Sequence, residues 1–237
     1  MSKKEEKMKI IKTLEIIDQY LSQFNMQEKV TSLQNLSFHL RSYSPSEVIL
    51  KEEDELDGIY FQVSGKTKVT TSLENGKSLL LRFCHPQAIF GDIELFQKVE
   101  IQSQVEAVEE TSLLFLDKQT IELYLMEDPL FLRELSKHLA YKLQTCTTAS
   151  RVNLLATVEA RFASYLLTTR DNHNHFGREI TTNQTEEIAS LIGTTQRHLN
   201  RIIHSFIKKK IIVKENKTFI VLDWGILAVL SNGVRYE

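Results

Sequence analysis

The sequence predicts an α+β fold in three successive parts, and three observations carry that prediction. Between about residues 38 and 116, short runs rich in β-branched and aromatic residues are separated by turn signals, which is typical of strands. From Pro129 through Ser150, apolar and small residues recur at helical spacing. The last part mixes short amphipathic helices with a pair of strand-like runs. We place the three parts at residues 1–127, 128–153 and 154–237.

Composition and cysteine content exclude several classes of protein. With 42% hydrophobic and 25% charged residues, the 237-residue chain matches ordinary globular proteins and is long enough for two modest domains. Its apolar runs fall far short of the ~20 residues of a membrane span, and no signal-peptide pattern is present. We therefore expect a cytoplasmic protein with no membrane association. Cys84 and Cys146 cannot supply a four-thiolate cluster within one chain, so we expect two reduced, part-buried thiols, no metal and no cofactor.

The first part begins with an amphipathic pattern that predicts a helix over residues 7–24. Six strand-like runs follow, at residues 48–50, 59–63, 67–71, 79–83, 88–90 and 112–116. Asn75-Gly76 between two of these runs is a strong hairpin signal. Many short strands at such spacing predict a jelly-roll-like β-roll.

The second part is one long helix. Asp128 followed by Pro129 is typical of a helix start. Leucines at alternating spacings of three and four are typical of a coiled-coil seam between two subunits, here Leu132, Leu135, Leu139 and Leu143. The alternative is that this helix packs only on its own β-domain. The pattern falters near residues 152–157, where we place a hinge, and a new amphipathic helix follows.

Residues 181–203 predict two helices joined by a tight turn. Asn183 and Glu186 fit a capping arrangement for a helix that ends at Ile192. Gly193 then supplies the turn, and Thr195 can cap the next helix. This is helix-turn-helix geometry, in which the second helix enters the major groove of DNA.

The side chains and charges of this region suit DNA. Gln196, Arg197 and Arg201 lie early on the second helix, where arginine can donate two hydrogen bonds to guanine and glutamine two to adenine. Residues 195–217 contain seven positive residues and one negative, whereas the whole chain has a net charge of −2. Such asymmetry indicates a module that meets phosphates. Lys208 and Lys210 precede a polar-tipped hairpin over residues 211–221, the wing of a winged helix, and are expected to contact phosphate.

In this order of parts the chain resembles the Crp/Fnr family of bacterial transcription regulators along essentially its whole length. The resemblance rests on Tyr60 to Gly65, Asn75-Gly76, Gly91 to Leu95, the helix from Pro129 onward, and the segment from Gly193 to Ile202. It implies a sensor-type β-roll, a homodimer, double-stranded DNA and RNA polymerase as partners, and no enzymatic activity. It also implies base reading by Gln196, Arg197 and Arg201, and phosphate contacts by Thr195 and His198. The family commonly has Glu where Arg197 stands, so we expect a different target site.

The resemblance also places an effector pocket, on Gly91, Asp92, Gln102, Ser103, Cys146 and Thr147. Family members that bind a cyclic nucleotide hold its phosphate with arginine, and this chain has Ile101-Gln102 there, or Gln102-Ser103 if the register shifts by one residue. Without that guanidinium the phosphate charge is uncompensated in a partly buried pocket. We therefore expect an unknown small-molecule effector other than cyclic AMP.

Two other functions fit parts of the pattern. A cupin-like metal-binding enzyme would need two or three histidines and a carboxylate on neighbouring strands. The single His-x-His pair, His173 and His175, falls in a predicted loop between residues 171 and 176. A winged helix used for protein contacts would show no salt-dependent affinity for DNA. Binding to duplex DNA at two salt concentrations therefore distinguishes the three hypotheses: a DNA-binding regulator, a metal-binding enzyme and a protein-interaction module.

Overall fold

The computed structural model describes residues 9–11, 14–76, 78–170 and 175–236. The chain forms two compact units. Unit 1 comprises residues 1–73 and 84–141, and unit 2 comprises residues 74–83 and 142–237. The bounds expected from the sequence, 1–127, 128–153 and 154–237, stay a prediction. His173 lies outside the described residues.

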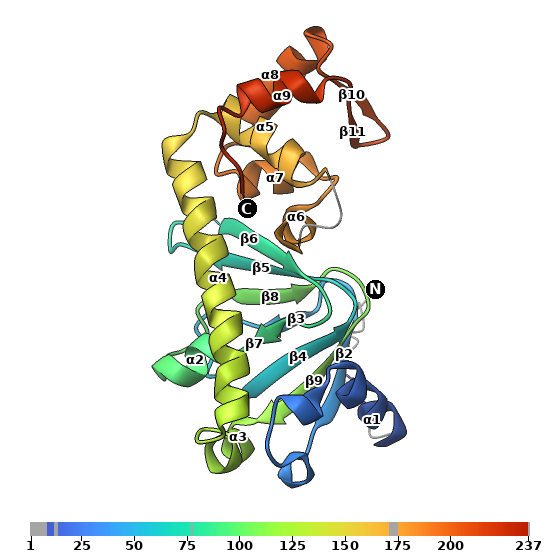
Figure 1. The fold of residues 1–237 in the computed structure, drawn as a ribbon, viewed down its shortest axis with the longest axis vertical. Coiled ribbons are helices and arrows are strands. Elements are labelled where there is room, and N and C mark those ends of the chain that lie inside the picture. Colours follow the sequence, from blue (N-terminus) through green and yellow to red (C-terminus); the bar gives the residue numbers. More distant parts are fainter. Residues whose placement is uncertain (1–8, 12–13, 77, 171–174, 237) are drawn as a thin grey trace, which may run out of the picture. The chain divides into compact units, whose positions relative to one another are not determined.

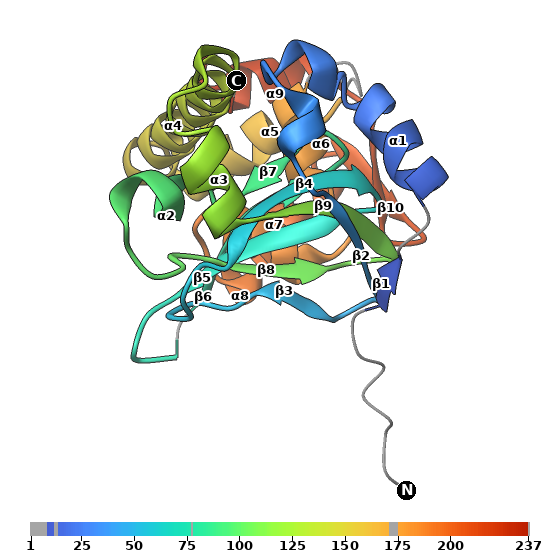
Figure 2. The ribbon, with the colours of Figure 1, turned by 90° about the horizontal axis from the view of Figure 1, so that it is seen from below.

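The β-rich part contains two antiparallel sheets. One has the order β1-β2-β9-β4-β7, with strands Lys9–Ile11, His39–Tyr43, Thr111–Asp117, Gly58–Ser64 and Ile89–Phe90. The other has the order β3-β8-β5-β6, with strands Val48–Leu50, Gln104–Ala107, Thr67–Ser72 and Ser78–Cys84. Figure 2 shows β4 and β9 in one layer and β3 and β8 in another. All six runs predicted as strands lie within these strands or overlap them, and the β-roll is confirmed.

Apolar strand residues fill the core of unit 1. Ile59, Leu114 and Leu116 are almost fully buried, because strands that pack on both faces lack the polar alternation of a half-exposed sheet. Gly65 has φ +79°, and a Cβ at this position would lie 2.7 Å from the Cα of Thr111. A side chain there would therefore separate β4 from β9.

The helices of unit 1 are α1 (Leu14–Gln23), α2 (Asp92–Gln97) and α3 (Lys118–Tyr124), and Met26–Glu28 and Leu33–Asn35 form 3-10 turns. The predicted helix over residues 7–24 is wrong over residues 9–11. Residues Lys9–Ile11 instead form β1, which pairs antiparallel with β2. The β-branched pair Ile10-Ile11 suits an edge strand as well as a helix, and the free edge of β2 decides between them.

The long helix α4 spans Pro129–Leu155 and begins where the sequence predicts (Figure 1). The carboxylate of Asp128 accepts hydrogen bonds from the backbone N–H groups of Leu130 at 2.9 Å and Thr31 at 2.6 Å. Burial alone would raise the pKa of Asp128, but these backbone donors outweigh it and lower that pKa. Asp128 therefore stays ionised and caps the helix.

Unit 2 contains five helices and one hairpin within the described residues. They are α5 (Val158–Thr168), α6 (His175–Ile180), α7 (Thr185–Leu191), α8 (Gln196–Lys208), β10 (Ile212–Glu215), β11 (Thr218–Val221) and α9 (Trp224–Leu230), besides the end of α4. Phe162, Ile188 and Phe206 are the centre of their shared core. The loop predicted over residues 171–176 is too long, because α6 already begins at His175.

No helix among the described residues is both long enough and apolar enough to cross a lipid bilayer.

Candidate nucleic-acid interface

The two helices of the motif, α7 and α8, are joined by a turn of four residues, Ile192 to Thr195. Gly193 adopts φ +63°, a conformation in which glycine has no steric penalty. The backbone N–H of Thr194 donates to the carbonyl of Ala189 at 2.9 Å, which closes the end of α7. The predicted helix-turn-helix is confirmed.

Caps define where each helix begins. The hydroxyl of Thr195 accepts a hydrogen bond from the backbone N–H of His198 at 3.2 Å, so the predicted cap of α8 is confirmed. The predicted cap of α7 is wrong. Its N-cap residue is Gln184 rather than Asn183, and the hydroxyl of Thr182 bonds to Glu187 instead. Thr182 lies before the N-cap residue and bonds to a side chain in the first turn of α7. A search for a capping residue three positions before Glu186 finds Asn183 and overlooks Thr182.

One face of α8 is buried and the other is free. Leu199, Ile203 and Phe206 are at most 3% exposed and pack into the core of unit 2. Gln196, Arg197 and Arg201 are all exposed. In the described part of the chain these three side chains have no hydrogen-bonding or ionic partner, so their donors are available to a ligand.

The residues predicted to contact phosphate lie around this free face. Thr195 is exposed and His198 is half-buried. Lys208 and Lys210 are exposed at the end of α8 and in the turn that follows it, whereas Lys209 between them lies 3.6 Å from the carboxylate of Glu159. The predicted wing is present as β10 paired with β11, and Asn216 and Lys217 form its tip.

Two residues outside the motif support its turn. Arg161 on α5 donates from Nε to the carbonyl of Ala156 at 2.8 Å, and from one terminal nitrogen to the carbonyls of Ile192 and Gly193, both at 3.0 Å. Asn153 on α4 donates to the carbonyl of Leu191 at 3.0 Å. Sequence analysis did not assign these roles, because neither residue lies near the turn in sequence.

The predicted dimer seam is only partly accessible in one subunit. Leu143 is 69% exposed, and Leu132 and Leu139 are half-buried. Leu135 is fully buried within the core of unit 1, so it has no surface to offer a partner. For Leu135 the alternative therefore holds, in which the helix packs on its own β-domain. The prediction that Leu135 belongs to the dimer seam is wrong.

The six residues of the predicted effector pocket are divided between the two units. Gly91 has φ +89°, and a Cβ there would lie 2.8 Å from the carbonyl oxygen of Gly58. Asp92 is buried, Gln102 is exposed and Ser103 is half-buried, all in unit 1. Cys146 and Thr147 are exposed on the part of α4 that belongs to unit 2. That these six residues line one pocket stays a prediction.

The cysteines differ from the expectation in one respect. Cys84 is buried, as expected of an inert thiol, but Cys146 is exposed. A terminal nitrogen of Arg82 lies 3.3 Å from the sulfur of Cys146 and 2.8 Å from the hydroxyl of Thr145. Sequence analysis did not single out Arg82.

Comparison with known proteins agrees with this geometry. Residues 40–128 match the model of the cyclic nucleotide-binding domain, and residues 160–230 match that of the Crp-like helix-turn-helix domain. The chain belongs to the Crp/Fnr family of transcription regulators. This Crp/Fnr regulator is 24% identical over 173 residues to the regulatory protein YeiL of Escherichia coli O157:H7, a match that covers 73% of the chain and 76% of YeiL.

A second protein sequence and a solved structure are also similar to this Crp/Fnr regulator. A CRP-like cAMP-activated global transcriptional regulator of Mycobacterium tuberculosis (strain CDC 1551 / Oshkosh) is 24% identical over 182 residues, covering 74% of the chain and 80% of that relative. The solved structure of a CooA mutant from Carboxydothermus hydrogenoformans superimposes with a TM-score of 0.68 at 21% identity, covering 90% of the chain and 95% of CooA. The regulator thus shares the fold of CooA and the domain order of the family.

Proposed function

We propose that this regulator binds an inverted-repeat DNA site as a homodimer, with one α8 in the major groove of each half-site. Gln196, Arg197 and Arg201 read bases, and Thr195, His198, Lys208 and Lys210 contact phosphates. The observation that carries the proposal is the exposure of all three reading side chains on a helix whose opposite face is buried. Two-fold symmetry then requires half-site centres about 34 Å apart, one turn of the duplex.

The test is binding to duplex DNA at two salt concentrations. A duplex selected by the protein from a random library is expected to bind far more tightly than an unrelated duplex. Both affinities should fall as salt rises, by about 0.9 logarithmic units per logarithmic unit of salt for each phosphate contacted. If the protein does not bind DNA, or if its affinity for DNA does not change with salt, the result would instead favour a winged helix used for protein contacts.

The proposed dimer forms through α4. Leu143 is 69% exposed although it lies in the middle of a long helix, and burial of such a side chain by a second copy contributes about 1.5–3 kcal/mol. We expect Leu143→Glu to shift the dimer to monomer in sedimentation experiments, because two carboxylates would face each other in an apolar seam.

The matched control for this variant is Leu123→Glu. Leu123 is 67% exposed on α3, so the same substitution there adds the same charge to a helix outside the proposed seam. It should leave the dimer intact. A Leu143→Glu protein that still sediments as a dimer would show that this part of α4 is not the interface.

The effector is proposed to be a small molecule other than cyclic AMP, although the mycobacterial relative is described as cAMP-activated. Residues 101–103 contain no cation, and the buried carboxylate of Glu94 accepts a hydrogen bond from the backbone N–H of Gln102 at 3.0 Å. A phosphate there would meet a like charge without a compensating guanidinium. Calorimetry with cyclic AMP should detect no binding, and a micromolar Kd at ordinary salt would contradict this part of the proposal.

The remaining partners and location follow from the proposed role. The regulator is proposed to act in the cytoplasm, where it meets chromosomal DNA and RNA polymerase, as the resemblance to its family implies. The predicted division into a sensor part (1–127), a dimerisation helix with hinge (128–153) and a DNA-binding part (154–237) is proposed as the functional division of the chain.

A further inference from the structure

The turn of the helix-turn-helix is tied to a distant part of the chain by a short chain of hydrogen bonds. The side-chain amide of Asn153 donates from Nδ2 to the carbonyl of Leu191, at 3.0 Å. The Oδ1 of the same amide accepts a hydrogen bond from the hydroxyl of Tyr236, at 2.7 Å. Tyr236 is 83 residues from Asn153 in sequence, and all three residues belong to unit 2.

The Asn153 amide is held from two sides. The carbonyl of Leu191 can only accept a hydrogen bond, so the NH₂ group of Asn153 faces it. The Oδ1 of Asn153 then faces Tyr236, whose hydroxyl donates to it. Without that hydroxyl, Oδ1 would lose this donor and the amide would be held only from the Leu191 side. Burial raises the pKa of Tyr236, so the donor proton stays in place.

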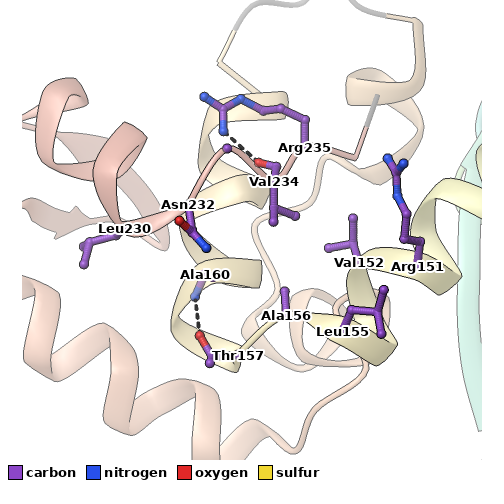
Figure 3. A pocket seen from close by; sticks show the side chains of 11 residues that line it. Arg151, Val152, Leu155, Ala156, Thr157, Ala160, Leu230, Asn232, Val234 and Arg235 are labelled. Atoms are coloured by element: carbon purple, nitrogen blue, oxygen red, sulfur yellow. Dashed lines mark hydrogen bonds between the residues drawn. The ribbon is translucent and has the colours of Figure 1, made fainter.

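The segment that carries Tyr236 borders a pocket on one side and packs into the core of unit 2 through Tyr236. A half-open pocket of about 570 Å³ is lined by part of this segment and by the corner between α4 and α5. Figure 3 shows Asn232 and Val234 of this segment around the pocket, with Val152, Leu155 and Ala156 also lining it.

Tyr236 itself is 2% exposed, and its backbone N–H donates to the hydroxyl of Thr168 at 3.3 Å. Tyr236 is therefore the anchor of the segment, and its hydroxyl holds Asn153 from the side opposite Leu191.

We propose that Tyr236 and Asn153 are positioning residues for DNA reading. They do not contact DNA themselves. They fix the position of the C-terminal end of α7, and thereby the position of the turn that leads into α8. Because Leu191 immediately precedes the turn, a displaced Leu191 carbonyl would shift the N-terminal end of α8, where Gln196 and Arg197 lie. The proposal rests on the DNA-reading role of α8 and adds to it a control of base selectivity from outside the motif.

The test compares two affinities of the Tyr236→Phe variant. This substitution keeps the buried ring and removes only the donor. We expect affinity for the duplex selected by the wild-type protein to fall by about 3- to 10-fold, the scale of one hydrogen bond, and affinity for an unrelated duplex to stay nearly unchanged. The salt slope should also stay unchanged, because no phosphate contact is lost. The affinity ratio is the affinity for the selected duplex divided by the affinity for the unrelated duplex. An equal ratio in the variant and the wild type would overturn the proposal.

A second variant tests whether the two residues act together. Asn153→Asp keeps an acceptor for Tyr236 but cannot donate to the carbonyl of Leu191, so it should reduce the affinity ratio at least as much. Adding Tyr236→Phe to Asn153→Asp should then have little further effect, because the link to Leu191 is already broken. Losses that multiply in the double variant would show that the two side chains act independently, and would overturn the proposal.

Tyr165→Phe is the matched control for stability. Tyr165 is also a buried tyrosine of unit 2, and its hydroxyl bonds to the carbonyl of Thr182, before α7, at 3.1 Å. Tyr165→Phe should lower the free energy of unfolding about as much as Tyr236→Phe does, but it should leave the affinity ratio unchanged. If it lowered the affinity ratio equally, a general loss of stability in unit 2 would be the cause. If the wild-type protein selects no duplex at all, the DNA-binding function fails instead, and the two failures are thus distinguished.

Discussion

Replacing Arg197 with alanine is expected to relax base preference at one position in each half-site of the selected DNA. Arg197 lies in the first turn of α8 with an exposed side chain, where it can reach the edge of a guanine. A bidentate contact of this kind discriminates against other bases by about 1–3 kcal/mol, so the preference at that position should fall by about 5- to 150-fold. Selection of duplexes from a random library by the wild type and the variant measures the change directly.

Lys208→Ala is the matched comparison, because it removes one positive charge from the opposite end of the same helix. It should weaken all sequences alike and reduce the salt slope by about one unit, as expected for one lost phosphate contact. The selected motif should stay the same. If Lys208→Ala changed the motif while Arg197→Ala left it intact, α8 would be placed in the wrong orientation on DNA.

Replacing Glu179 with alanine is expected to lower the free energy of unfolding by about 3–5 kcal/mol, because it leaves the buried guanidinium of Arg82 without this carboxylate. A carboxylate oxygen of Glu179 lies 3.1 Å from a terminal nitrogen of Arg82, and both side chains are only 9% exposed. Denaturant unfolding of the variant measures the loss. Glu186→Ala, at an exposed glutamate on α7, is the control and should change stability by less than about 1 kcal/mol.

A second contact of Glu179, with His175, makes part of the stability depend on pH. Glu179 also lies 3.2 Å from Nδ1 of His175, and its hydrogen bond raises the pKa of that histidine. A raised pKa in the folded state contributes stability that is present below the unfolded pKa and is lost as pH rises through the folded one. The wild type should therefore keep this contribution below about pH 6.5 and lose it as the pH rises further. Glu179→Gln should reduce that pH dependence, and an unchanged profile would remove His175 from this role.

Local patterns predicted the helix-turn-helix well because its determinants are close together in sequence. Gly193 supplies the positive φ of the turn, and Thr195 caps α8 through a residue only three positions away. The strands of the β-roll were found for the same reason, since β-branched runs and turn residues mark them locally. The strand β1 was missed because a helix and an edge strand both suit Ile10 and Ile11, and only the neighbouring β2 decides.

The long-range part of the site could not be predicted in this way. Arg82 meets Glu179 across 97 positions, and Asn153 meets Tyr236 across 83. No periodicity or spacing relates residues so far apart, and each of these side chains would suit an exposed surface equally well. The seam prediction failed at Leu135 because helical periodicity identifies an apolar stripe without saying whether the same chain or a second copy covers it.

The guanidinium of Arg161 is a single cation placed at the carboxyl ends of two helices. α4 ends at Leu155 and α7 at Leu191, and the carbonyls that Arg161 binds, those of Ala156, Ile192 and Gly193, follow directly. The negative ends of both helix dipoles thus lie at one positive charge. Electrostatic attraction therefore stabilises this arrangement of the two helix ends in addition to packing. A lysine would keep the charge but not the planar fork that reaches two helix ends at once. Arginine and lysine are therefore not equivalent at this corner, where one planar side chain joins the carboxyl ends of two helices.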